Sequence, residues 1–117
     1  MKQKLISILE LFGFPVLLQG SMNEDAEYPP SFFTFWNFET PEDKHYDNKA
    51  VRAVWGFWVY FYSDDPEKVD DMLGRAAQKM KENGWTIEGK GEDVASDQPT
   101  HTGRMVTCRY VEYYDNV

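Results

Sequence analysis

The stretch Lys49–Ser63, KAVRAVWGFWVYFYS, constrains the fold most, because nearly every position from Ala50 to Tyr62 is apolar or aromatic. Its Val, Trp, Phe and Tyr side chains favour the pleated surface of a β-strand. Side chains alternate between the two faces of a strand, so one face is predicted to enter the core with Val51, Ala53, Trp55, Phe57, Val59 and Phe61. At about 3.3 Å per residue the strand spans about 40 Å, and part of it is predicted to project beyond its own domain.

The second face of this strand carries too many aromatic side chains for a surface that meets only water. Trp58, Tyr60 and Tyr62 are predicted to lie together there, because they are spaced two residues apart. Aromatic residues are enriched where protein interfaces concentrate their binding energy, so these three are candidate interface residues. The alternative is a central strand that the rest of its own chain covers on both faces.

Periodicity and turn signals predict the remaining elements. A helix over Lys2–Phe12, ended by Gly13 and Pro15, is predicted from one apolar stripe: Leu5, Ile8, Leu9 and Phe12. Asp65 as N-cap and Pro66 at the first helical position predict a second helix that ends at Asn83 and Gly84. The strands are predicted at Ser31–Glu39, Lys49–Ser63, Trp85–Glu88 and Gly103–Tyr114, and the apolar segment Pro15–Gln19 is compatible with a short edge strand.

The chain is therefore predicted to form a single domain, residues 1–117, of the α+β class with the order α-β-β-α-β-β. The first two long strands should pair as an antiparallel hairpin around the charged loop Thr40–Asn48. A right-handed crossover through the second helix then places the last strand between the second and third strands. We expect a mostly antiparallel four-stranded sheet of order 1-2-4-3 with both helices on one face. Gly89–Thr100 is predicted to be a second long loop.

Charge narrows the range of partners. The chain has 20 acidic and 12 basic residues and a formal net charge of -8. Nucleic acids and anionic membranes both attract basic segments, so neither sequence-specific nucleic acid nor a membrane is an expected partner. The charge is compatible with DNA that passes through an acidic channel without adhering to its wall. The N-terminal segment is not expected to be a secretion signal, because Glu10 interrupts its apolar run.

The sequence singles out no catalytic, cofactor-binding or metal-ligating set. His45 and His101 lie in separate predicted loops, whereas a zinc site requires about four ligands at suitable spacing. Cys108, the only cysteine, lies within a predicted strand and is expected to be buried. The protein is therefore predicted not to be an enzyme and to need no cofactor and no metal. An active site of convergent carboxylates or His45 on the same scaffold is the less favoured alternative.

Three stretches of the chain resemble a known family. YPPSFFTFWNFETPEDKHYDN, VWGFWVYFYSDDPE and DVASDQPTHTGRM, the last followed by a strand, are similar to small proteins encoded among prophage tail genes of Gram-positive bacteria. Over roughly Leu5 to Tyr114 the plan also resembles the tail-completion, or head–tail joining, proteins of long-tailed phages. The resemblance implies a structural protein of the virion, made in the host bacterial cytoplasm. It implies a ring, typically a hexamer, around the DNA channel where the tail tube meets the head connector, formed by a subunit that is often monomeric in isolation.

Two zones are candidate protein interfaces within this interpretation. One is the sheet face with Trp58, Tyr60 and Tyr62. The other is the loop Thr40–Asn48, with the candidate residues Asp43, His45, Tyr46 and Asp47. The alternative for this loop is a tip that contacts only solvent. Gly89–Thr100 is a third, weaker candidate. The expected partners are other phage tail or neck proteins and further copies of the chain. The alternative function is a small intracellular protein-binding or regulatory module that uses the aromatic face for a non-phage partner.

Overall fold

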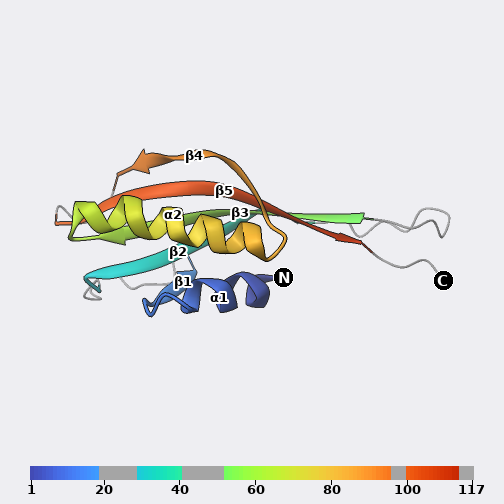
Figure 1. Cartoon of the computed structure of the whole chain (residues 1–117), viewed down its shortest axis with the longest axis horizontal. Helices are drawn as coiled ribbons and strands as arrows, with labels where there is room; N and C mark the ends of the chain where they lie inside the picture. The colour runs from blue at the N-terminus through green and yellow to red at the C-terminus, as the bar shows by residue number, and fades with distance from the viewer. Residues whose placement is uncertain (19–28, 41–51, 96–99, 114–117) are drawn as a thin grey trace.

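The computed structural model describes residues 1–18, 29–40, 52–95 and 100–113, which form an α+β fold of two helices and one mixed sheet (Figure 1). The elements follow one another as α1 (Lys2–Glu10), β1 (Val16–Leu18), β2 (Ser31–Glu39), β3 (Arg52–Ser63), α2 (Pro66–Glu82), β4 (Thr86–Val94) and β5 (Thr102–Tyr113). The predicted fold class and both predicted helices are confirmed. Of the candidate interface loop Thr40–Asn48, only Thr40 is among the described residues.

The sheet has five strands in the order β1-β2-β3-β5-β4. β1 and β2 are parallel, and the other neighbouring pairs are antiparallel. The predicted order of the long strands is confirmed, but the predicted total of four strands is wrong, because Val16–Leu18 pairs with Phe33–Phe35 as an edge strand. Gly13, with φ +81°, turns the chain after α1, and the Phe33 amide then donates to the Pro15 carbonyl at 2.8 Å.

β4 is longer than predicted, because a bulge interrupts its pairing without ending it. Thr86–Glu88 of the predicted strand Trp85–Glu88 and the first half of the predicted loop Gly89–Thr100 form one strand, whereas Trp85 precedes it. Its register against β5 shifts between Glu88 and Glu92. Gly89 and Gly91 have φ values of 70° and 94° within the shift, a conformation that glycine adopts without the steric cost of a side chain. The prediction of a loop from Gly89 is therefore wrong as far as Val94.

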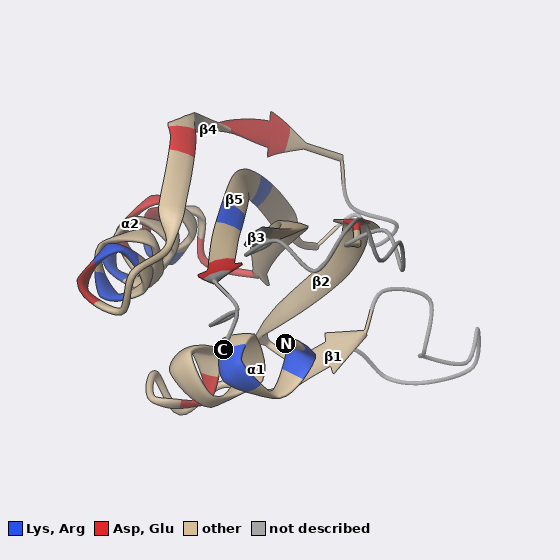
Figure 2. Ribbon diagram, turned by 90° about the vertical axis from the view of Figure 1, so that its right-hand side faces the viewer, with Lys and Arg blue, Asp and Glu red and all other residues tan. Residues whose placement is uncertain are grey.

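Both helices pack on one face of the sheet, as predicted (Figure 2). The helices contribute the buried side chains Leu5, Ile8, Leu9, Val69, Leu73, Ala76 and Met80. The sheet contributes the buried side chains Phe33, Phe35, Phe57, Val59, Phe61, Val106 and Cys108. Full burial of a Val, Leu or Phe side chain stabilises a fold by about 1.5–3 kcal/mol. The predicted core face of β3 is thus confirmed for Phe57, Val59 and Phe61, and Trp55 packs against the core while only partly buried. Ala53 is buried but does not belong to this cluster.

The ends of α2 follow from local chemistry. The Asp65 carboxylate accepts a hydrogen bond from the Glu67 amide at 3.1 Å, and Pro66 occupies the start of the helix, as predicted. After Asn83, Gly84 adopts φ +91° and leads the chain toward β4. Among the described residues, neither helix has both the length and the apolar character that a membrane crossing requires.

β3 and β5 pair over their whole length, from Arg52 opposite Tyr113 to Ser63 opposite Thr102. At the Arg52 end the two strands extend past both helices (Figure 1). Trp55 and Tyr110, which face each other, still pack against the core, so the projecting part begins beyond this pair. We call this part, residues 52–54 and 111–113, the β3–β5 ribbon. It confirms the predicted projection of the long strand.

Val69→Asp is expected to lower the free energy of unfolding by about 3 kcal/mol or more, because it places a carboxylate where the native side chain is only 4% exposed. Gln78→Asp adds the same group to an exposed position of α2 and should cost less than about 1 kcal/mol. Urea unfolding followed by circular dichroism measures both. Equal losses in the two variants would mean that α2 does not pack against the sheet through Val69.

Candidate protein-interaction surface

The face of the sheet opposite the helices is built from cross-strand rows of residues. Phe32 lies opposite Tyr62, and Trp36 lies opposite Trp58. β5 continues these rows with small or flexible residues: Gly103 beside Tyr62, Met105 beside Tyr60 and Thr107 beside Trp58. We call the rings of this surface the aromatic face: Phe32, Trp36, Phe38, Trp58, Tyr60 and Tyr62.

The rings of the aromatic face stack on one another. Tyr62 is stacked between Phe32, at 5.3 Å between ring centroids, and Tyr60, at 6.1 Å with an interplanar angle of 5°. Phe38 stacks on Trp58 at 4.8 Å. Such pairs contribute about 0.5–1.5 kcal/mol beyond the burial of their area. The rings are therefore held in place before any partner arrives, which lowers the entropy that binding would cost.

Two glycines allow these rings to lie close to the sheet. A Cβ atom at Gly103 would come within 2.5 Å of the Tyr62 ring, and a Cβ atom at Gly56 within 2.7 Å of the Phe38 ring. Glycine in a strand commonly marks a site of close approach, and here the approaching group is an aromatic ring. The rings of Phe38 and Tyr62 can therefore lie against the sheet only because glycine occupies these positions of β3 and β5.

Exposure changes along the aromatic face. Phe32 is 3% exposed, whereas Trp36 is 46% exposed and is one of the most exposed large apolar side chains among the described residues. Trp58, Tyr60 and Tyr62 are each partly buried. The structure thus brings the three predicted sheet residues together on one surface, and this surface is most exposed to solvent at Trp36.

Asp43, His45, Tyr46 and Asp47, the other predicted interface residues, lie outside the described residues. Trp36 and Phe38 were not predicted as interface residues. The signal for Trp36 was present in the sequence, since it has the same alternation as Phe32 and Thr34. Its position opposite Trp58 depends on the register, which the structure supplies.

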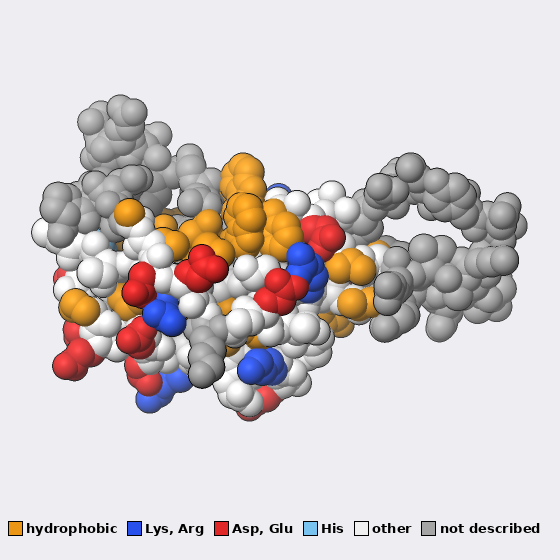
Figure 3. Space-filling view, turned by 90° about the horizontal axis from the view of Figure 1, so that it is seen from above, with side chains coloured by type: hydrophobic (Ala, Val, Ile, Leu, Met, Phe, Trp, Pro, Cys, Tyr) orange, Lys and Arg blue, Asp and Glu red, His pale blue; other side chains and the backbone are white. Residues whose placement is uncertain are grey.

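A charged group adjoins the open end of the aromatic face. Arg109 Nε donates to Glu39 Oε1 at 2.9 Å, and Arg109 Nη1 forms an ion pair with Glu88. The guanidinium carbon lies 5.2 Å from the centroid of the Phe38 ring. Figure 3 shows hydrophobic side chains standing together, with acidic and basic side chains beside them. Sequence reasoning missed this group, because it joins three strands whose register was unknown.

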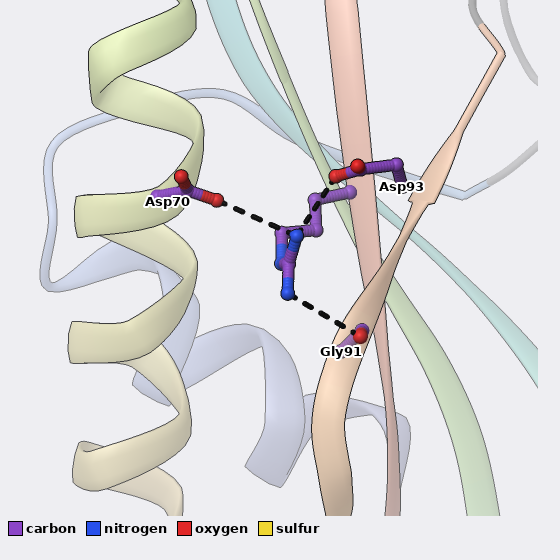
Figure 4. A network of polar contacts seen from close by, with 4 residues as sticks. Asp70, Gly91 and Asp93 are labelled. Atoms are coloured by element: carbon purple, nitrogen blue, oxygen red, sulfur yellow. Dashed lines mark hydrogen bonds and ion pairs between the residues drawn. The ribbon is translucent and has the colours of Figure 1, made fainter.

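A second arginine of β5 lies on the helix side of the sheet. Arg104 Nη1 is 2.8 Å from Asp93 of β4 and 3.6 Å from Asp70 of α2, and its Nη2 donates to the Gly91 carbonyl (Figure 4). Hollows of about 430 and 460 Å³ lie between α2 and the β4 region, and Asp70 lines both. The Arg104 contacts link β4 to α2 across this space, in addition to the pairing of β4 with β5 that positions the strand.

The described residues include no cluster of three or more His, Cys, Asp or Glu side chains that could hold a metal ion. His101 is engaged in local structure, with Nε2 2.9 Å from the Pro29 carbonyl oxygen and Nδ1 3.0 Å from Thr100 Oγ1. Cys108 is completely buried, as predicted, and burial raises the pKa of its thiol to about 12. A thiol with this pKa stays protonated at neutral pH and is a poor nucleophile.

Comparison of the chain with protein-family models finds no match, and comparison with curated proteins finds none either. The aromatic face, the charges beside it and the sequence resemblance therefore carry the functional argument.

Gly103→Ala is expected to lower the free energy of unfolding by about 1–3 kcal/mol, because the new methyl group displaces the Tyr62 ring from its stack. Gly74→Ala is the matched control. Its Cβ would meet nothing within 4 Å on α2, so it should raise the free energy of unfolding by about 0.5–1 kcal/mol. Urea unfolding and near-ultraviolet circular dichroism test both changes; stabilisation by Gly103→Ala would mean that the Tyr62 ring does not lie on this glycine.

The buried Cys108 thiol predicts a specific dependence of stability on pH. Its pKa is about 12 in the folded chain, whereas a thiol in an unfolded chain has a pKa of about 8.5. Only the unfolded chain loses this proton between these values, so the contribution is intact below about pH 8.5 and decreases as pH rises toward 12.

Cys108→Ala removes this ionisation and leaves the other titrating groups unchanged. From pH 8 to pH 10 the wild type should lose about 2 kcal/mol more stability than Cys108→Ala, as measured by urea unfolding of both proteins. Parallel pH profiles would show that the thiol is accessible to water in the folded state.

Proposed function

We propose that this protein is a structural assembly protein of a phage or prophage, a head–tail joining or tail-completion protein, that acts by ring assembly and protein–protein contacts and not by catalysis. The observation that carries the proposal is the aromatic face. It combines stacked rings with Trp36, which is 46% exposed. The resemblance of the three sequence stretches to prophage tail proteins supplies the biological setting.

The aromatic face has the composition of an interface centre. Tryptophan and tyrosine are enriched among the residues that dominate binding energy, and rings that are already stacked lose little freedom on binding. Trp58, Tyr60 and Tyr62 supply this surface from β3, and Trp36 supplies it from β2. A partner that covered Trp36 would bury apolar area at about 25 cal/mol per Å².

The β3–β5 ribbon supports the same proposal. It is a pair of strands that extends past the helices (Figure 1), which is a geometry suited to contact with a neighbouring subunit. Val54 and Val111 face each other on the ribbon, and both side chains are partly exposed. The ribbon and the aromatic face thus give one subunit two separate surfaces, one for a neighbouring copy in the ring and one for another protein of the tail or neck.

The proposed partners are other phage tail or neck proteins and copies of the chain itself. The ring in the particle is a hexamer, the isolated chain is a monomer, and the site of action is the tail or neck of the virion after synthesis in the bacterial cytoplasm. The net charge of -8 would help a channel wall to avoid holding DNA. A mapped ring lumen that is neutral or basic would contradict this last part.

A small intracellular protein-binding or regulatory module is the second candidate. The same aromatic face favours it, because the argument from exposed and stacked rings holds for any protein partner. The two candidates differ in the identity of the partner and in the assembly that results.

Light scattering of the pure protein, alone and mixed with tail tubes encoded by a neighbouring gene, tests the proposal. We expect a monomer of 13.7 kDa that becomes tube-bound, or a ring of about six copies. A stable dimer that ignores the tubes would contradict the tail-completion assignment and support the binding module.

Tyr60→Ala is expected to weaken tube binding about tenfold or more, because it removes a partly buried ring from the aromatic face. It should lower the free energy of unfolding by less than about 2 kcal/mol. Phe61→Ala, at the next position, is the control for folding, since Phe61 is completely buried and its truncation should cost about 3–5 kcal/mol. Equal destabilisation by the two changes would place Tyr60 with the core residues instead.

A further inference from the structure

The exposed tryptophan and the charged group around Arg109 form one continuous surface. Trp36, Trp58, Thr107 and Glu88 are successive partners across β2, β3, β5 and β4. The next row contains Glu39 opposite Gly56 and Gly56 opposite Arg109. Rows that share a face are about 6.6 Å apart along a strand, so one extended segment can contact both. We call this surface the Trp36 end: Trp36, Phe38, Glu39, Trp58, Glu88 and Arg109.

The Trp36 end carries more negative than positive charge. Two carboxylates, Glu39 and Glu88, share the single guanidinium of Arg109, which leaves a formal excess of one negative charge. The Glu39 side chain is 41% exposed and that of Glu88 is 50% exposed, whereas Arg109 is 32% exposed. The carboxylates are thus the more accessible members of the group, and each can accept further hydrogen bonds.

Exposed aromatic faces beside accessible carboxylates recognise a guanidinium. Its planar cation stacks on tryptophan and donates hydrogen bonds to carboxylate oxygens in the same plane. Phe38 and Glu39 already hold Arg109 in this way within the chain, at 5.2 Å from the ring centroid and 2.9 Å from the oxygen. Trp36 offers an open ring for a second such cation.

Charge decides between the possible occupants. Nucleic acid and other anionic partners are repelled by the excess carboxylate and by the net charge of -8. A second copy of the chain has 20 acidic and only 12 basic residues, so it complements this negative surface less well than a basic segment does. A segment of a different protein that carries arginine next to apolar side chains complements this surface. Its arginine pairs with the negative charge, and its apolar side chains pack on the exposed Trp36 ring.

We propose that the Trp36 end binds an arginine-bearing extended segment of another protein, with a guanidinium stacked on the Trp36 ring beside the Glu39 carboxylate and with Glu88, farther along the same surface, adding negative charge. This inference rests on the proposed function, because it names the chemistry of the partner that the aromatic face takes. It places the self-association of a ring on other surfaces, such as the β3–β5 ribbon.

The test compares two synthetic peptides on the full-length protein. One is an acetylated and amidated octapeptide in which arginine alternates with leucine, and the other has citrulline, which is neutral and of the same shape, in place of every arginine. Binding is measured by fluorescence anisotropy of labelled peptide. The wild type should bind the arginine peptide about tenfold more tightly than the citrulline peptide.

Two double variants separate a local site from general attraction by an acidic protein. Glu39→Gln with Glu88→Gln should reduce the preference for arginine about fivefold, because it removes both carboxylates of the site. Asp70→Asn with Asp93→Asn removes the same number of charges around Arg104 on the other face of the sheet, and it should retain the preference. Trp36→Ala should weaken the binding of both peptides.

Equal affinity of the wild type for the two peptides would overturn the inference, as would an equal loss in both double variants. Self-association that disappears in Glu39→Gln with Glu88→Gln, without any preference for arginine, would also overturn it and assign the surface to a second copy. The tail-tube experiment is independent of these outcomes. Wild-type protein that binds tubes but shows no preference for the arginine peptide would leave the tail assignment in place and refute the arginine site.

Discussion

The alternation of side chains along β3 is the constraint on which the other elements depend. β3 pairs with β2 on one edge and with β5 on the other, so it fixes the register of both neighbours. Phe57, Val59 and Phe61 are buried against the helices, while Trp58 and Tyr60 face the other way. A slip of one residue would exchange these two sets and place polar hydroxyls in the core, which is why the register is strongly specified.

The aromatic face shows how a strand can be stable without a second covering layer. Its rings cover one another, and Gly56 and Gly103 give them room to lie close to the backbone. Glycine weakens a strand by about 0.5–1 kcal/mol relative to alanine, and a ring pair stabilises by a similar amount, so the arrangement is close to neutral for folding. What it gains is an ordered apolar surface that ends at an exposed Trp36.

The two arginines of β5 show that position decides what a charged group does. Arg104 and Arg109 each meet two carboxylates from separate elements. Arg104 lies on the helix face, where its contacts link β4 to α2 (Figure 4). Arg109 lies on the aromatic face next to Phe38, where the same kind of contact borders an exposed ring. Exposed ion pairs contribute about 0–1 kcal/mol to stability, so the main difference between the two groups is what lies beside them.

The sequence alone determined what depends on neighbouring residues: the ends of α2, the stripe of α1, the two faces of β3 and the burial of Cys108. Capping, helical periodicity and strand alternation act over a few residues, and they were predicted correctly. Tertiary structure decided the parallel pairing of β1, the bulge that lengthens β4 and the meeting of Arg109 with Glu39, which is 70 residues away along the chain. These features depend on the register between distant strands, and a register is set by the packing of all the strands together and not by any one segment.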